Sequence, residues 1–114
     1  MIYLMVLANI LLLVTGQLCW KIGMARIENL NIGTLIQSLF TPYIFGGLVL
    51  YGFATLLWLW ILAKAEFSMV YPLQSLAYAL GVVVAIFVFK EDVTALRWIG
   101  VATIILGAVL VAKG

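Results

Sequence analysis

Long apolar stretches separated by short charged segments dominate the pattern of this chain. Four stretches carry no charged residue, or only basic residues close to their ends, and they cover residues 1–20, 43–63, 69–89 and 94–113. A bilayer core about 30 Å thick needs about 20 apolar residues to be crossed by a helix. Long basic side chains near a helix end can reach the headgroups. The pattern therefore predicts four transmembrane helices, near residues 2–22, 43–63, 69–89 and 95–113.

The first stretch lacks the basic start and the small-residue cleavage site of a signal peptide, so we expect it to be a retained helix.

The segment before Pro42 has a different, amphipathic pattern. Its apolar residues recur at helical spacing and leave polar residues on the other face: Ile32, Leu35, Ile36, Leu39 and Phe40 against Thr34, Gln37, Ser38 and Thr41. Asn31 is a suitable N-cap. This predicts a short helix over 32–40 that lies in the membrane interface. The alternative is a tilted extension of the second transmembrane helix.

Composition places the chain in one class and excludes several others. Of its 114 residues, 68% are hydrophobic and 9% are charged, which a small water-soluble domain cannot accommodate. We expect a single all-α transmembrane domain over 1–114. There is no His, Cys19 is the single cysteine, and the net charge is +2 without a basic run. The chain therefore offers no catalytic, metal, cofactor or nucleic-acid site, and an enzyme is not expected.

The basic residues give a weak orientation signal. Lys21, Arg26, Lys90 and Arg97 fall on one side of the predicted membrane, and Lys64 and Lys113 fall on the other. The side richer in Lys and Arg is usually cytoplasmic. The bias predicts cytoplasmic loops 1 and 3 and external termini.

Polar residues within the first predicted helix suggest a binding site. Asn9, Leu13, Gly16, Gln17, Trp20 and Lys21 share one helical face. Gln17 and Lys21 lie one turn apart, and an amide next to an ammonium suits an anionic, oxygen-rich group. The structural alternative is that Gln17 bonds a neighbouring helix and Lys21 extends to lipid phosphate.

The third predicted helix carries a second polar patch in its first half. Tyr71, Ser75 and Tyr78 fall on one face, with Gln74 on the adjoining one, and they are candidates for lining a substrate path. Tyrosines are also common at membrane interfaces without any binding role. Pro72 lies near the predicted helix start, where a missing amide hydrogen is tolerated.

The remaining candidates are loop charges and a stripe of small residues. Glu66, Glu91 and Arg97 are possible charge partners, although solvated loop charges explain them equally well. Gly100, Thr103 and Gly107 form a stripe that favours close helix packing, within the chain or between two copies.

These residues resemble a known superfamily. Four short helices and the Gly16-x-x-x-x-Lys21 spacing are similar to small multidrug resistance proteins and their drug/metabolite transporter relatives. Multidrug members carry a glutamate three residues before the matching glycine. Leu13 stands at that position here, which argues against proton-coupled export of cations.

The aminoarabinose-phosphoundecaprenol flippase subunits resemble this chain more closely. The similar segments are residues 16–21, 57–59, 70–72 with 75–76, and Glu91 followed by 97–101 and 104–107. This resemblance implies a flippase that moves a polyprenyl-phosphate-linked sugar across the bacterial inner membrane. It also implies a homodimer, or a heterodimer with a similar small subunit, and no cofactor.

Lys21 and Gln17 would hold the phosphate of such a lipid, and Tyr71, Ser75 and Tyr78 would line a path for the sugar. Two other readings remain at this point. The chain can be a small-molecule or cation transporter that uses Glu66 or Glu91 as counter-charge, or a non-transporting accessory subunit of a membrane glycosyltransferase.

Overall fold

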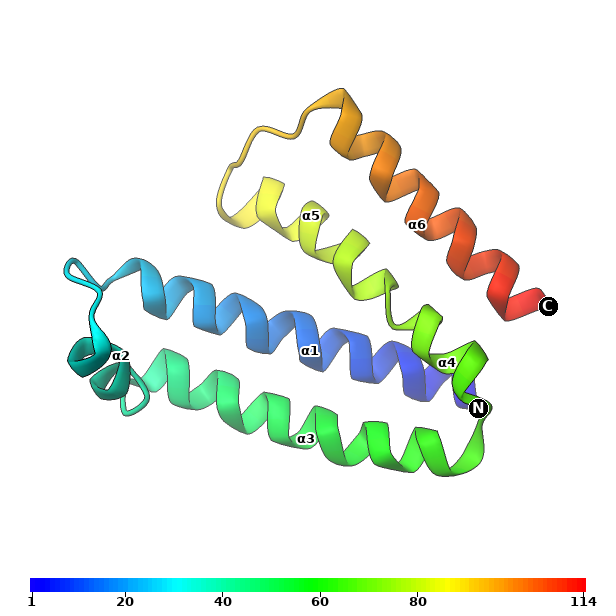
Figure 1. Cartoon of the computed structure of the whole chain (residues 1–114), viewed down its shortest axis with the longest axis horizontal. Helices are drawn as coiled ribbons and strands as arrows, with labels where there is room; N and C mark the ends of the chain where they lie inside the picture. The colour runs from blue at the N-terminus through cyan, green and yellow to red at the C-terminus, as the bar shows by residue number, and fades with distance from the viewer.

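The computed structural model describes residues 1–114 as an all-helical chain without strands. Its six helices form four segments that are long and apolar enough to cross a membrane, with α4 and α5 making up the third (Figure 1). The predicted fold class and all four spans are confirmed. The helices are α1 (Ile2–Ala25), α2 (Ile32–Ser38), α3 (Pro42–Lys64), α4 (Phe67–Leu73), α5 (Leu76–Val88) and α6 (Ala95–Lys113).

The short helix between the first two spans is also confirmed. Asn31 caps α2 as predicted: its side chain accepts a hydrogen bond from the Thr34 backbone at 2.9 Å, and the Thr34 hydroxyl accepts one from the Asn31 backbone at 2.9 Å. The apolar side chains of this segment are exposed, with Ile32 at 78% and Phe40 at 81%. Because nothing in the chain covers this apolar face, its insertion into the membrane interface stays a prediction.

The third span agrees with the prediction over 69–89 in position, but it is divided into α4 and α5 rather than being one regular helix. The chain breaks at Gln74 and Ser75, where the backbone bonds tighten to three-residue turns such as Ser75 N–H to Pro72 O at 3.0 Å. Pro72 lies well inside the helix rather than at its start. Its ring removes the amide that would bond the Ser68 carbonyl, which favours a break at the following turn.

Helices α1 and α3 pack closely because glycines face each other where they cross. The backbones meet at Gly16 and Gly47: a Cβ atom at Gly16 would lie 3.3 Å from the Gly47 carbonyl oxygen, and one at Gly47 would lie 2.9 Å from the Gly16 carbonyl oxygen. Trp20 covers Gly47, stacks on Tyr51 with 4.8 Å between ring centroids, and donates its indole hydrogen to the Ile44 carbonyl at 3.1 Å. Small residues at such a crossing allow close helix approach in lipid.

The apolar core lies at one end of the molecule. Its buried side chains come from the start of α1, the end of α3, α4 and α6: Val6, Ile10, Ile61, Val70, Leu73 and Ala108. Only 15 of 114 residues are buried, and the molecule is flat, measuring 47 × 37 × 21 Å. Most large apolar side chains therefore face outward, as expected for a surface that meets lipid or another subunit.

The stripe of small residues on α6 does not pack against this chain. Gly100, Thr103 and Gly107 are all exposed, and a Cβ atom at either glycine would meet nothing within 4 Å. The Thr103 hydroxyl bonds only its own helix, at the Ile99 carbonyl. The predicted packing within the chain is therefore not formed, and packing against a second subunit stays a prediction.

The glycine crossing gives a direct test of this packing. We expect Gly47→Ala to lower the free energy of unfolding by about 1–3 kcal/mol, because the new methyl group would lie 2.5 Å from the Trp20 ring. Gly52→Ala is the matched control in the same helix, since its methyl group meets nothing within 4 Å. Thermal unfolding in detergent measures both. Equal stability of the two variants would contradict the packing described.

Labelling tests whether α2 lies in the interface. With Cys19 replaced by Ala, a spin label at Ile36 should be reached by oxygen dissolved in the bilayer, and one at Gln37 by a water-soluble relaxation agent. The two positions are neighbours, so they share any general mobility of the helix. Water access at both positions would instead place α2 outside the membrane.

Candidate functional site

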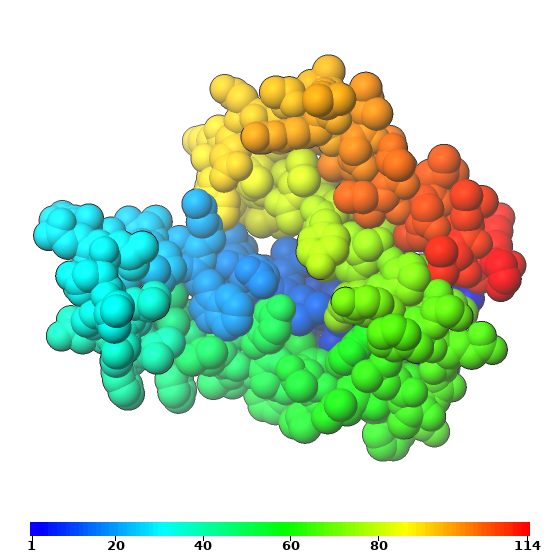
Figure 2. Space-filling model, in the orientation of Figure 1, coloured from blue at the N-terminus to red at the C-terminus, as the bar shows by residue number.

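A cavity of about 740 Å³ lies between α1, α3 and the third span. Figure 2 shows the surface hollowed between α1 and α5. This volume is in the range of ligand sites in proteins. Its 18 lining residues include 12 hydrophobic ones, so the cavity is mostly apolar and carries a few polar groups.

One row of α1 residues faces this cavity. Asn9, Leu13, Gln17 and Lys21 follow each other at four-residue spacing and all line it. Gly16 and Trp20, which the sequence placed on the same broad face, turn instead toward α3. The contact between Gly16 and Gly47 fixes the rotation of α1 about its axis. Gly16 and Trp20 are therefore covered by α3, and the row that includes Gln17 and Lys21 faces the cavity.

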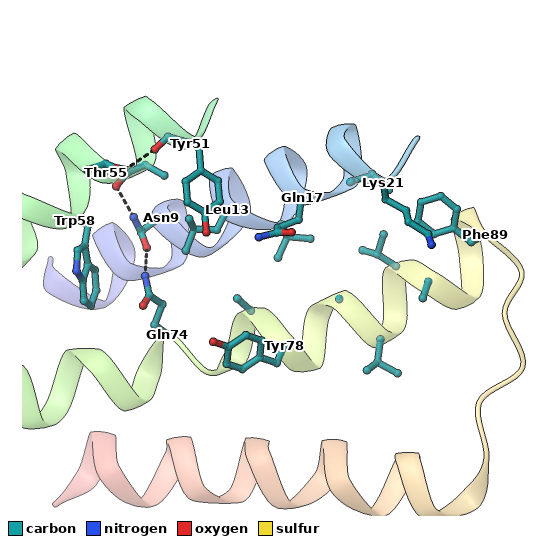
Figure 3. A pocket seen from close by; sticks show the side chains of 18 residues that line it. Asn9, Leu13, Gln17, Lys21, Tyr51, Thr55, Trp58, Gln74, Tyr78 and Phe89 are labelled. Atoms are coloured by element: carbon teal, nitrogen blue, oxygen red, sulfur yellow. Dashed lines mark hydrogen bonds between the residues drawn. The ribbon is translucent and has the colours of Figure 1, made fainter. Parts of the chain in front are cut away.

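Gln17 and Lys21 both line the cavity, and their role in binding stays a prediction. Figure 3 shows no hydrogen bond from either side chain to another lining residue, and both residues are exposed. The predicted alternative for Gln17, a bond to a neighbouring helix, is therefore not formed within the chain. An amide and an ammonium without partners are available to bind an anion.

The third span brings only part of its predicted patch to the site. Tyr78 and Gln74 line the cavity, whereas Tyr71 and Ser75 do not. Tyr71 is instead stacked on Phe67, with 4.8 Å between ring centroids. The break after Leu73 explains the difference, because a continuous helix would have kept residues at seven-residue spacing on one face.

The predicted charge partners lie outside the cavity. Glu66 precedes α4 as its N-cap residue, and Glu91 and Arg97 are exposed near the loop before α6. None of the three lines the cavity, and Lys21 is the single charged residue that does. A bound cation would therefore meet no carboxylate there.

Several lining residues were not recognised as site candidates from the sequence. The cavity is lined, next to Asn9 and Gln74, by four further residues: Tyr51, Thr55, Trp58 and Phe89. Asn9 and Gln74 are polar residues in apolar segments, and this was the sequence feature that could have identified this part of the cavity. Their contact with each other depends on how α1, α3 and the third span pack.

The Asn9 side chain joins all three of these helices. It is completely buried, donates a hydrogen bond to the Ala54 carbonyl at 2.7 Å and accepts one from the Gln74 amide at 3.1 Å (Figure 3).

The chain is thus a small four-span membrane protein with a mostly apolar cavity that carries one cation and several amides. This arrangement is typical of a transporter for amphipathic molecules.

Comparison with known proteins agrees with this class. Over 112 residues the chain is 29% identical to a probable 4-amino-4-deoxy-L-arabinose-phosphoundecaprenol flippase subunit, ArnE of Proteus mirabilis, covering 98% of this chain and 97% of the relative. It is 31% identical over 112 residues to the ArnF subunit of Serratia proteamaculans, covering 91% and 86%. With ArnE of Yersinia pseudotuberculosis it shares 32% identity over 117 residues, covering 96% and 95%.

The chain belongs to this family of small flippase subunits. No family model matches it, and no solved structure matches it. Its four helical spans and its membership of this bacterial flippase family make the chain a multi-pass protein of the bacterial inner membrane.

The lack of a cavity carboxylate predicts a lack of drug export. Cells that overproduce the protein should show unchanged resistance to quaternary ammonium compounds, because a cation entering the cavity meets Lys21 and no counter-charge. Growth inhibition assays with and without induction measure this. Resistance that disappears on replacing Glu66 or Glu91 would restore the cation-transport hypothesis.

Proposed function

We propose that this chain is a flippase subunit that moves a polyprenyl-phosphate-linked sugar between the leaflets of the inner membrane. The observation that carries the proposal is the unpartnered pair of Gln17 and Lys21 in an otherwise uncharged cavity. The relatives are named for a phosphoundecaprenol-linked sugar, a lipid with one anionic phosphodiester. This is a transport function, and no catalytic step is proposed.

The chemistry of the cavity suits each part of such a lipid. Lys21 supplies a positive charge near the α2 end of α1, and Gln17 adds amide donors one turn deeper. The sugar would enter the uncharged part of the cavity, and the polyprenyl tail would remain among the exposed apolar side chains and membrane lipids. Movement of the polar head through the protein avoids its passage through hydrocarbon.

A second subunit is part of the proposal. The chain is 21 Å thick along its shortest axis, and the stripe of Gly100, Thr103 and Gly107 is exposed along α6. Small residues on a lipid-facing helix allow another helix to approach closely. We therefore place the contact with a second copy, or with a similar small subunit, along this stripe.

Substitution of Lys21 tests the phosphate site. A charge-assisted hydrogen bond contributes about 1.5–3 kcal/mol, so Lys21→Met should weaken binding of undecaprenyl phosphate about ten- to a hundredfold. Lys21→Arg should retain part of the binding because the charge remains, and Gln17→Leu should have a smaller effect than Lys21→Met. Titration of the purified protein with the lipid measures these affinities.

Lys113→Met and Gln37→Leu are the matched controls, since both residues lie outside the cavity. Each variant must first insert and assemble like the parent protein. If Lys21→Met binds the lipid as tightly as the parent, then Lys21 only anchors the helix at the headgroups and the proposed site is wrong.

A further inference from the structure

The end of the cavity farthest from Lys21 carries hydrogen-bonding groups and an aromatic ring. Lys21 lies at one end in Figure 3, and Asn9, Trp58 and Gln74 lie at the other. Asn9 and Lys21 are separated by about 18 Å along α1. We call the far end, formed by Asn9, Thr55, Trp58 and Gln74, the amide end of the cavity.

The Ala54 carbonyl sets the orientation of two side-chain amides at this end. A carbonyl oxygen only accepts hydrogen bonds, so it is the Asn9 amide nitrogen that meets it, at 2.7 Å. The Asn9 oxygen is thereby turned toward Gln74 and accepts from Gln74 Nε2 at 3.1 Å. Asn9 is completely buried, so water cannot replace either partner. Gln74 therefore presents its nitrogen to Asn9, and its oxygen is left without a partner in the chain.

The Thr55 hydroxyl is a second acceptor at this end. Its single hydrogen is donated to the Tyr51 carbonyl of its own helix at 2.8 Å, so its lone pairs are what it can offer to a ligand. Trp58 lines the same end, and an indole ring attracts a cation within about 6 Å of its centroid. The amide end thus combines two oxygen acceptors with an aromatic ring.

A primary ammonium group matches this set of groups. It has three hydrogens to donate, no lone pair to accept, and a positive charge that an aromatic ring attracts. Two of its hydrogens can meet the oxygens of Gln74 and Thr55, while its charge lies beside Trp58. The second hydrogen of the Gln74 amide nitrogen remains for a hydroxyl group next to the ammonium.

The counter-charge of such an ammonium comes with the ligand. None of the 18 lining residues is Asp or Glu, so a lone cation that loses its hydration in the cavity gains no opposite charge there. A lipid head with a phosphodiester and an ammonium on one sugar ring carries both charges and is neutral overall. Its ammonium needs only neutral acceptors, and the protein does not have to desolvate a carboxylate of its own.

We propose that the amide end is the subsite for the ammonium group of a lipid-linked amino sugar. Gln74, Thr55 and Trp58 distinguish this ammonium from a hydroxyl group, and Asn9 is a positioning residue that holds Gln74. The proposal rests on the proposed flippase function and assigns the part of that cavity that recognises the sugar. The relatives are named for a 4-amino sugar, which carries a group of this kind.

The spacing along α1 determines how such a head lies in the cavity. One sugar ring is too short to reach from Lys21 to Asn9, about 18 Å along the helix. Gln17 lies about 12 Å from Asn9, and the side chains of Gln17 and Gln74 can shorten this gap from both ends. The phosphate therefore lies near Gln17 when the ammonium is at the amide end, and near Lys21 when the ammonium is not.

Three lipids with the same tail and phosphate test the subsite. They are undecaprenyl phosphate, the same lipid carrying arabinose, and the same lipid carrying 4-amino-arabinose. Binding to the purified protein in nanodiscs should be tightest for the amino lipid, by about three- to tenfold over the arabinose lipid. This is the range expected when an ammonium replaces a hydroxyl group beside neutral acceptors and an indole ring.

Substitutions at the amide end should change this preference alone. Thr55→Val and Trp58→Leu leave the bond between Asn9 and Gln74 in place. Each should reduce the preference for the amino lipid over the arabinose lipid about two- to fivefold. Binding of undecaprenyl phosphate, which has no sugar, should be unchanged in both variants. Lys21→Met should instead weaken the binding of all three lipids and keep the preference.

The chain offers a matched control for each substitution. Thr15→Val corresponds to Thr55→Val, because the Thr15 hydroxyl also bonds its own helix, at the Leu11 carbonyl, and Thr15 lies outside the cavity. Trp60→Leu corresponds to Trp58→Leu, because Trp60 belongs to the same helix and does not line the cavity. Both control variants should keep the preference of the parent protein.

The outcomes distinguish the subsite from the proposed function. If the parent protein binds the arabinose lipid as tightly as the amino lipid, the subsite is wrong while the flippase function stands. The same holds if the preference persists in both Thr55→Val and Trp58→Leu, or if these variants weaken all three lipids equally. If no lipid binds, the proposed function fails together with the subsite.

Discussion

The close contact between α1 and α3 is the constraint on which the rest of this structure depends. Gly16 and Gly47 bring the two backbones together, and Trp20 closes the contact through its stack on Tyr51. Once this face of α1 is occupied, its rotation is set. The neighbouring row from Asn9 to Lys21 is then the one that remains open toward α5. The position of the cavity therefore follows from a contact made by residues that do not line it.

The second constraint is that polar groups within a membrane need partners. Asn9 meets this requirement by joining the Ala54 carbonyl and Gln74, which ties α1, α3 and the third span together. Gln74 lies where Pro72 has already interrupted the helical hydrogen bonds. The break thus has two effects: it turns Tyr78 and Gln74 toward the cavity, and it leaves Tyr71 stacked on Phe67 outside it.

The charge pattern gives the cavity its chemical character. Lys21 is the single charged residue of the lining and lies at one end of the cavity, and the uncharged amides of Asn9 and Gln74 lie at the other. The related flippase subunits are named for a sugar linked to phosphoundecaprenol, a lipid that carries an anionic phosphate. The chain is flat and its α6 stripe is exposed, and along this stripe we propose the contact with a second subunit.

Several properties of this protein followed from sequence alone, because they depend on local composition and periodicity. The four spans and the capped helix after Asn31 are of this kind, since the membrane thickness and helix geometry determine them directly. The sequence also placed Gln17 and Lys21 on one helical face, because residues four positions apart lie one turn from each other, and both line the cavity. Only the tertiary structure decided the break at Gln74, the displacement of Tyr71 and Ser75 from the cavity, and the hydrogen bond between Gln74 and Asn9. These features depend on which neighbouring helix each face packs against. In a chain whose helix faces are almost all apolar, the local sequence does not distinguish one packing partner from another.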